Sequence, residues 1–148
     1  MHKRLLATLL LAATALAAGK PADSVKYRQS VMKAMGAHMT ALSMIAKGQV
    51  ADRGQFTAHA EAIHALSGEI PNLFPAGSGP DKVKTSAKSD VWQRAADFKA
   101  AAAKLESESA KLVAAAKHND AAARNTQFAA TGEQCNGCHK VFRVRDTE

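Results

Sequence analysis

Two cysteines and a histidine stand close together near the C-terminal end of the sequence, in the order Cys135-Asn136-Gly137-Cys138-His139. Two cysteines separated by two residues, with a histidine directly after the second, are the signature of covalent attachment of a c-type haem. On a helix, Cys135 and Cys138 share one face, so both sulfurs can reach the two vinyl groups of one porphyrin. His139 follows on the same turn, where its imidazole can serve as an axial ligand of the iron.

Three other chemistries use a cysteine pair at this spacing, and the sequence lacks what each would need. A structural zinc site takes four cysteine or histidine ligands. The sequence has no second cysteine pair. The remaining histidines do not supply a second pair of zinc ligands either; they are His2, His38, His59, His64 and His118. A thioredoxin-like redox motif lies near a βαβ pattern, which is not seen here. A disulfide between such close residues would stabilise little. Haem attachment is therefore the favoured interpretation.

The N-terminal residues 1–18 have the features of a secretory signal peptide. Basic residues are followed by a short apolar run and then by an Ala-Leu-Ala triplet at 15–17. The run is too short to predict a membrane span. We predict cleavage after residue 17 or 18, which leaves residues 19–148 as one domain. We also predict a periplasmic location, because bacteria attach haem covalently outside the cytoplasm.

The formal net charge of the whole sequence is +7, and the loss of Lys3 and Arg4 with the signal peptide lowers it to +5. A modest positive charge of this kind favours an acidic partner surface. The lysines are spread along every segment without interleaved aromatic residues, so we expect no nucleic-acid partner. We expect no membrane association once the signal peptide has been removed.

The first half of the mature chain predicts two helices. Apolar residues recur at helical spacing over residues 21–47, and Gly48 fits a C-terminal stop. A second helix opens at Asp52, which with Gln55 three residues later resembles a capping box. Its apolar stripe ends at Pro71.

The second half predicts a loop followed by two further helices. Residues 71–88 hold three prolines and two glycines without periodicity, so we predict a crossover loop that passes the haem edge. One helix is predicted from Ser89, as its N-cap, to about residue 118. Another is predicted from about residue 119 through Phe142, with both cysteines on its inward stripe. Four helices with one long middle connection predict an all-α antiparallel four-helix bundle with covalently attached haem in the core.

Three further stretches accompany the attachment motif. Residues 26–32 read Lys-Tyr-Arg-Gln-Ser-Val-Met, residues 73–78 read Leu-Phe-Pro-Ala-Gly-Ser, and residues 84–88 read Lys-Thr-Ser-Ala-Lys ahead of Trp92. Together with the motif on the last of four helices, they resemble cytochrome c prime, the four-helix class of c-type cytochromes. The resemblance covers essentially the whole mature chain and implies one covalent haem c per chain.

On the side of the iron ligand, the resemblance implies roles for four residues. Cys135 and Cys138 match the two cysteines that form thioether bonds to the haem, and His139 matches the proximal ligand of the iron. Arg143, one turn beyond His139, matches a basic residue that neighbours this ligand on the solvent side.

Around the haem edge, the resemblance implies contacts from the first helix and from the middle loop. Arg28 and Gln29 match a pair that contacts the haem edge and its propionates. Thr85 and Ser86 match a loop position that also touches the haem. Ser86 departs from the acidic residue that is often found there.

Met32 matches the residue over the distal face of the iron. In cytochrome c prime this residue covers the face without binding, which leaves the iron five-coordinate. In similar low-spin bundle cytochromes, a methionine at the matching position is the sixth ligand of the iron. A methionine on a buried stripe is also ordinary core packing. Arg28-Gln29 ahead of Met32 favours the five-coordinate form.

The expected function follows from this coordination. A five-coordinate iron implies a protein that transfers one electron with a redox partner protein and binds small gases, nitric oxide or carbon monoxide. The alternative is a low-spin electron carrier in which Met32 and His139 both bind the iron. We expect no enzyme, because no general acid or base is placed near the distal face.

The remaining expectations concern packing. Trp92 and Phe98 are expected in the core or packed against the haem, with the core favoured. The histidines of the four predicted helices lie at positions compatible with solvent or an interface, and we expect them at the surface. The resemblance implies a homodimer through the first two helices, a contact to which four apolar residues would contribute: Met35, Met39, Leu42 and Met44.

Overall fold

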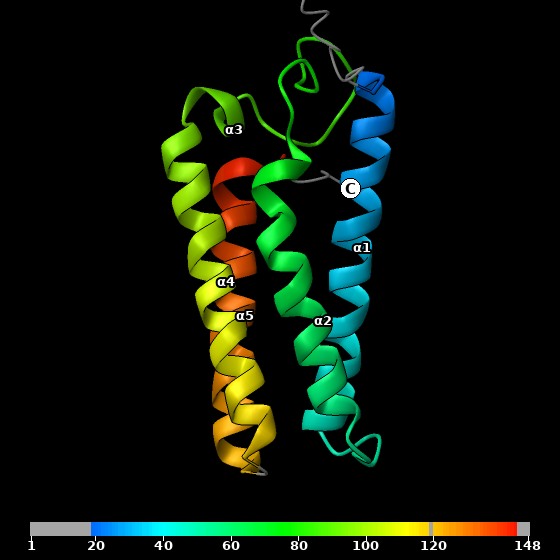
Figure 1. The fold of residues 1–148 in the computed structure, drawn as a ribbon, viewed down its shortest axis with the longest axis vertical. Helices are drawn as coiled ribbons and strands as arrows, with labels where there is room; N and C mark the ends of the chain where they lie inside the picture. The colour runs from blue at the N-terminus through cyan, green and yellow to red at the C-terminus, as the bar shows by residue number, and fades with distance from the viewer. Residues whose placement is uncertain (1–18, 119, 145–148) are drawn as a thin grey trace, which may run out of the picture.

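Four long helices stand side by side in the computed structural model of the chain, which describes residues 19–118 and 120–144 (Figure 1). These helices are α1 (Pro21–Ala46), α2 (Gln55–Glu69), α4 (Ala95–Lys117) and α5 (Ala121–Phe142). Two short helices, the 3₁₀ helix η1 (Ile70–Leu73) and α3 (Asp90–Gln93), flank the long connection. The predicted all-α bundle is confirmed, whereas the predicted signal peptide lies outside the described residues.

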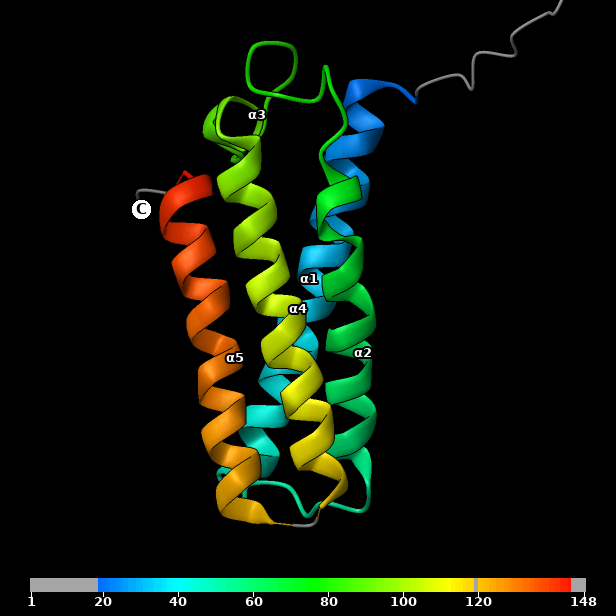
Figure 2. The same ribbon diagram turned by 60° about the vertical axis from the view of Figure 1, so that its left-hand side comes forward.

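The connections divide the bundle into two ends. Both short connections lie at the lower end in Figure 1, and the long connection lies at the upper end, where α5 also finishes. Figure 2 shows α5 beside α4 along its whole length. The pairs α4–α5, α2–α4 and α1–α2 are closely packed, whereas α1 and α5 make far fewer contacts with each other. The interface between α1 and α5 is thus the most open in the bundle.

The core side of α5 follows a regular pattern of three- and four-residue steps. Phe128, Thr131, Cys135, Cys138 and Phe142 form this stripe, in which Thr131 and Phe142 are buried and the other three pack against the core partly buried. Steps of three and four residues keep side chains on the face that meets the neighbouring helices. The prediction that both cysteines lie on the inward stripe is confirmed.

The predicted ends of the first and last helices are confirmed. Pro21 begins α1, where its missing N–H leaves no hydrogen bond unmade. The chain leaves α1 through Gly48, whose φ of 69° favours glycine. Asp120 caps α5, because its Oδ1 accepts a hydrogen bond of 2.9 Å from the N–H of Ala122.

The prediction of one helix from Ser89 to residue 118 is wrong at Arg94. There the backbone leaves the helical region (φ −118°, ψ 47°) and divides the segment into α3 and α4. Just before the break, the Trp92 indole N–H donates to the carbonyl oxygens of Phe74 and Pro75 in the long connection, at 3.2 and 3.3 Å. Ser89 makes no side-chain capping bond.

The capping box predicted at the start of α2 forms only in part. Asp52 Oδ1 accepts hydrogen bonds from the N–H groups of Gly54 and Phe56, as a capping carboxylate does. Gln55, however, accepts from the N–H of Arg53 rather than from that of Asp52. The N-cap position belongs to Gly54, whose φ of 96° suits glycine.

The prediction of surface histidines is wrong for three of the four. His38 and His59 are half-buried, with their Nδ1 atoms 2.9 Å apart across α1 and α2. His64 is half-buried as well, with its Nδ1 3.1 Å from the hydroxyl of Ser109 on α4. Only His118 is exposed as expected. These contacts join residues far apart in the sequence.

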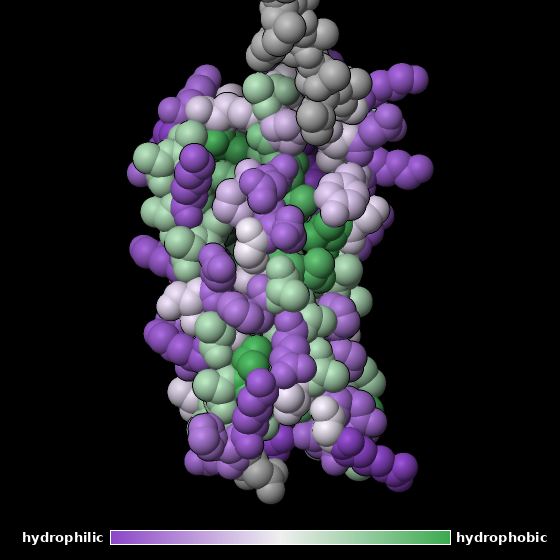
Figure 3. Space-filling view, viewed as in Figure 1, coloured by the Kyte–Doolittle hydropathy of each residue, from purple (hydrophilic) through white to green (hydrophobic). Residues whose placement is uncertain are grey.

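The four apolar residues expected at a dimer contact mostly serve this chain's own core. Met35 and Leu42 are buried in it, Met39 packs against it, and only Met44 is exposed, at 41%. Figure 3 shows apolar residues at the surface between α1 and α2, among polar and charged ones. A dimer through these helices stays a prediction.

Candidate haem-binding site

Cys135 and Cys138 lie one turn apart on α5, each as a half-buried free thiol. Burial raises the pKa of both thiols, and for Cys138 the neighbouring Cys135 adds to the effect. His139 is exposed as a whole, yet burial of its ring, followed by the charge of Arg143, lowers its pKa. The imidazole is therefore neutral at pH 7, the form in which histidine binds a metal. This donor set fits covalent haem attachment with one axial ligand.

The relative register of α1 and α5 is fixed by Met39 and Gly132. A Cβ atom on Gly132 would lie 3.6 Å from the Met39 Cε, so these two positions face each other. Met32 lies seven residues before Met39, and His139 lies seven residues after Gly132. Because the helices are antiparallel, both steps move about 10 Å toward the same end and turn by only about 20°. Met32 and His139 therefore lie level with each other on facing sides of the α1–α5 interface.

Arg28, one turn before Met32 on α1, is buried and holds the long connection. Its guanidinium donates to Ser78 Oγ (2.8 Å), to the Ser78 carbonyl oxygen (2.9 Å) and to Thr85 Oγ1 (2.8 Å). It also lies 5.0 Å from the centre of the Phe74 ring. Burial lowers the pKa of Arg28. All three acceptors are neutral oxygen atoms, so this buried positive charge is hydrogen-bonded without being neutralised by them.

The other predicted loop residues lie between α1 and the end of α5. Besides bonding Arg28, Thr85 Oγ1 accepts from the N–H of Ala87. The Ser86 carbonyl oxygen accepts a hydrogen bond of 2.7 Å from the N–H of Val144. Gln29, by contrast, is exposed on α1 beside Arg28. The connection therefore runs from the buried guanidinium to the segment that follows the attachment motif.

The end of α5 is tied to this connection by backbone hydrogen bonds. The Lys88 N–H donates to the Phe142 carbonyl oxygen at 2.9 Å, and Ala87 and Arg143 form an antiparallel bridge. The Arg143 N–H donates to the carbonyl oxygen of His139. Arg143 therefore lies one turn from His139, and its charge acts on the imidazole.

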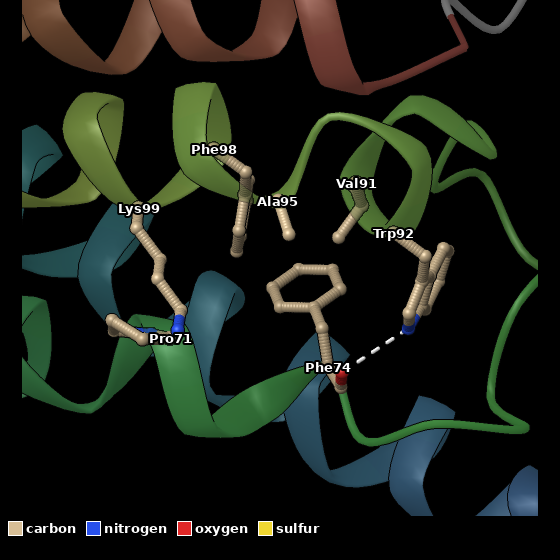
Figure 4. Close-up of a pocket in the computed structure, with 7 residues that line it drawn as sticks. All are labelled: Pro71, Phe74, Val91, Trp92, Ala95, Phe98 and Lys99. Carbon is tan, nitrogen blue, oxygen red and sulfur yellow. Dashed lines mark hydrogen bonds between the residues drawn. The ribbon is translucent and has the colours of Figure 1, made fainter.

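Ser78 and Phe74 were not assigned individual roles from the sequence, whereas Trp92 and Phe98 were expected in the core. Phe74 packs edge-on against Phe98, and Phe98 packs in the same way against Phe142. Beside them is a pocket of about 120 Å³ (Figure 4), lined by Pro71, Phe74, Val91, Trp92, Ala95, Phe98 and Lys99. Phe98 is buried and Trp92 half-buried. Ser78 ends the 73–78 stretch that carries the resemblance and lies between two glycines, but neither feature identifies its partner.

The comparisons with known proteins agree with one another. The sequence profile of the Cytochrome c' family matches residues 23–143. The chain belongs to the cytochrome c' family. It is 42% identical to cytochrome c' of Pararhodospirillum photometricum over 123 residues, covering 83% of this chain and 98% of that protein.

Solved structures of the same family share the fold. Cytochrome c prime from Shewanella frigidimarina has a TM-score of 0.78 and 32% identity, covering 85% of this chain and 98% of that one. A nitric oxide complex of a variant of cytochrome c prime from Alcaligenes xylosoxidans has a TM-score of 0.76 and 31% identity. It covers 86% of this chain and 98% of its own.

Membership of the cytochrome c' family means that the chain carries a covalently attached c-type haem. Cys135, Cys138 and His139 are the residues that would hold it. Within residues 19–118 and 120–144, no helix is long and apolar enough to cross a membrane.

Proposed function

We propose that this chain is a periplasmic haem protein that transfers one electron and binds nitric oxide or carbon monoxide on the face opposite His139. The proposal is carried by the register in which Met32 and His139 lie level across the α1–α5 interface. In this proposal His139 is the only protein ligand of the iron. When bound, the haem supplies the redox and gas-binding chemistry, and the chain controls access and environment.

Met32 covers the distal face in this proposal. Its side chain is half-buried and packs against a core cluster that includes its buried neighbours Val31 and Met35. Thioether and alkyl groups donate no hydrogen bond to a ligand. The polarity and hydrogen-bond donors of a distal pocket decide which ligands bind. Neutral diatomic gases are therefore favoured over anions, and a variant of the Alcaligenes xylosoxidans protein has been solved as a nitric oxide complex.

Arg28 is proposed to contact the haem propionates. A buried guanidinium without a negative charge beside it is costly, whereas a carboxylate would both neutralise it and accept its hydrogen bonds. Its present acceptors, Ser78 and Thr85, hold it at the edge of the α1–α5 interface. Gln29 and Ser86 complete the proposed edge of the haem site from α1 and from the connection.

The partner and location are also proposed. Cleavage of residues 1–18 would release the chain into the periplasm with a charge of +5. His139, Lys140 and Arg143 are all exposed at the end of α5. The positive charges of Lys140 and Arg143 beside the proximal ligand would attract an acidic redox partner. We propose binding and electron transfer rather than catalysis, because Met32 and its buried neighbours Val31 and Met35 are apolar side chains that can act neither as acid nor as base.

The alternative is a low-spin electron carrier in which the Met32 sulfur binds the iron. The same level placement of Met32 and His139 supports it, because a methionine opposite a histidine is one of the ordinary haem ligand pairs. In that case the iron would have no free position, and gases would have to displace the sulfur.

The test is the rate at which carbon monoxide and nitric oxide bind the ferrous holoprotein, measured by stopped-flow absorption. We expect direct binding to the wild type and several-fold faster binding to Met32→Ala. Met44→Ala, an exposed position on the same helix, is the matched control and should behave as wild type. If the wild type does not bind gas and only the Met32→Ala variant does, the low-spin carrier is established instead.

A further inference from the structure

His38 on α1 and His59 on α2 form a pair that the haem site does not use. Their Nδ1 atoms lie 2.9 Å apart, their ring centres lie 5.1 Å apart and the ring planes are tilted by 50°. Both residues are half-buried. Since Met39 rather than His38 faces α5, the pair lies at the α1–α2 interface, away from the attachment motif.

The contact requires that the two rings have different protonation patterns at Nδ1. One Nδ1 carries a proton and donates, and the other accepts through its lone pair. If the donor ring moves its proton to Nε2, both Nδ1 lone pairs become free on neighbouring atoms. Neutral imidazole nitrogen is the commonest metal ligand among protein side chains. The pair therefore brings two nitrogen donors from two packed helices close enough to bind one ion after a small turn of each ring, because the two Nδ1 atoms now point at each other.

We propose that His38 and His59 chelate a divalent transition-metal ion, with Cu(II) preferred. Each ring would have to turn for both Nδ1 atoms to bind one ion at about 2.0 Å. Two imidazole nitrogens from neighbouring helices can then fill adjacent positions of the tetragonal geometry that Cu(II) and Ni(II) adopt. Cu(II) is also the tightest-binding of the divalent first-row ions at a given site.

The remaining coordination positions would be filled by water. Within the described part of the chain, no group of three or more histidine, cysteine, aspartate or glutamate residues is arranged to hold a metal. Half-buried rings leave one side of the pair open to solvent. The proposed site is therefore an exchangeable two-histidine site rather than a closed structural one.

The experiment titrates the ferric holoprotein with copper sulfate and follows Cu(II) by calorimetry and electron paramagnetic resonance. We expect one Cu(II) per chain with nitrogen hyperfine structure and an unchanged haem absorption spectrum. His38→Gln and His59→Gln should each weaken binding by at least about tenfold. Two control variants should bind Cu(II) as the wild type does. They are His64→Gln, at a half-buried histidine that contacts Ser109, and His118→Gln, at an exposed histidine.

A second measurement leaves the chain unaltered. Diethyl pyrocarbonate modification, mapped by mass spectrometry, should be suppressed by Cu(II) at His38 and His59 but not at His118. Equal copper binding by wild type and the His38→Gln/His59→Gln double variant would overturn the proposal. Protection spread equally over all three histidines would overturn it too.

Discussion

Met39 on α1 lies against Gly132 on α5, where a Cβ atom would be 3.6 Å from the methionine's terminal methyl carbon. This contact fixes how the distal and proximal helices are set against each other. Met32 lies seven residues from Met39, and His139 lies seven residues from Gly132. Both steps run toward the end of the bundle that holds the long connection, so Met32 and His139 lie level. The placement of the two residues proposed to flank the iron therefore follows from the close approach of Met39 to position 132.

Gly132→Leu tests this register. A leucine must push Met39 and α1 away, so we expect a loss of about 1–3 kcal/mol in the free energy of unfolding and a changed haem spectrum. Gly36→Leu is the control, because a Cβ at Gly36 meets nothing within 4 Å. Denaturant unfolding of both holoproteins measures the difference. Equal stability of the two variants would show that α1 and α5 are set differently.

Arg28→Met removes three hydrogen bonds from a buried guanidinium while keeping most of the side-chain volume. Hydrogen bonds to charged groups contribute about 1.5–3 kcal/mol each without adding fully, so we expect a loss of at least about 2 kcal/mol. Lys33→Met, at an exposed position on α1, should change stability by no more than about 0.5 kcal/mol. Unfolding in guanidinium measures the free energy of unfolding of both variants. Similar losses in the two would show that Arg28 does not hold the long connection in place.

Asp52 gives a pH-dependent contribution to stability. Burial acts to raise the pKa of Asp52, but the N–H groups of Phe56 and Gly54 and the Arg124 guanidinium, 2.7 Å away, together lower it. A lowered folded-state pKa stabilises the fold above the unfolded value of about 4 and loses that contribution as pH falls further. Asp52→Asn, which can still cap the helix, should therefore cost about 1 kcal/mol at pH 7.

The pH series decides this prediction. The stability difference between wild type and Asp52→Asn should narrow as the pH is lowered below about 4. Asp81→Asn, at an exposed ion pair, is the control and should match wild type throughout. A difference between wild type and Asp52→Asn that stays constant from pH 7 to pH 3 would contradict the assigned role of the carboxylate.

The Cys135→Ala/Cys138→Ala variant tests haem attachment and its link to folding. Both thiols lie on the inward stripe of α5 and pack against the core, so the haem they hold would add a large apolar surface to that core. We expect haem that extracts into acidified solvent and a poorly folded chain by circular dichroism. The wild type should keep its haem through denaturation. A cooperative, fully helical variant without haem would show that the bundle folds unaided.

Local patterns predicted the parts of the fold that depend on neighbours in sequence. The three- and four-residue steps from Phe128 to Phe142 placed Cys135 and Cys138 inward, because periodicity alone decides which face of a helix is buried. The break at Arg94 was not predictable in this way. It accompanies a contact of Trp92 with the carbonyl oxygens of Phe74 and Pro75, which lie 17 to 18 residues away in the sequence.

The contacts between helices were also beyond sequence reasoning. The His38–His59 pair joins residues 21 positions apart, and the hydrogen bonds from Arg28 to Ser78 join residues 50 apart. Each depends on how two helices, or a helix and a loop, are set against each other. A single sequence carries no direct signal of such registers, so the resemblance supplied Arg28 and Thr85 but not Ser78.

The absorption and electron paramagnetic resonance spectra of the purified holoprotein, ferric and ferrous, test the central claim most directly. With His139 as the only protein ligand and Met32 packed over the open face, both oxidation states should be high-spin and five-coordinate, and Met32→Ala should change the resting spectrum little. A low-spin wild type with a methionine–iron charge-transfer band, turning high-spin in Met32→Ala, would contradict it.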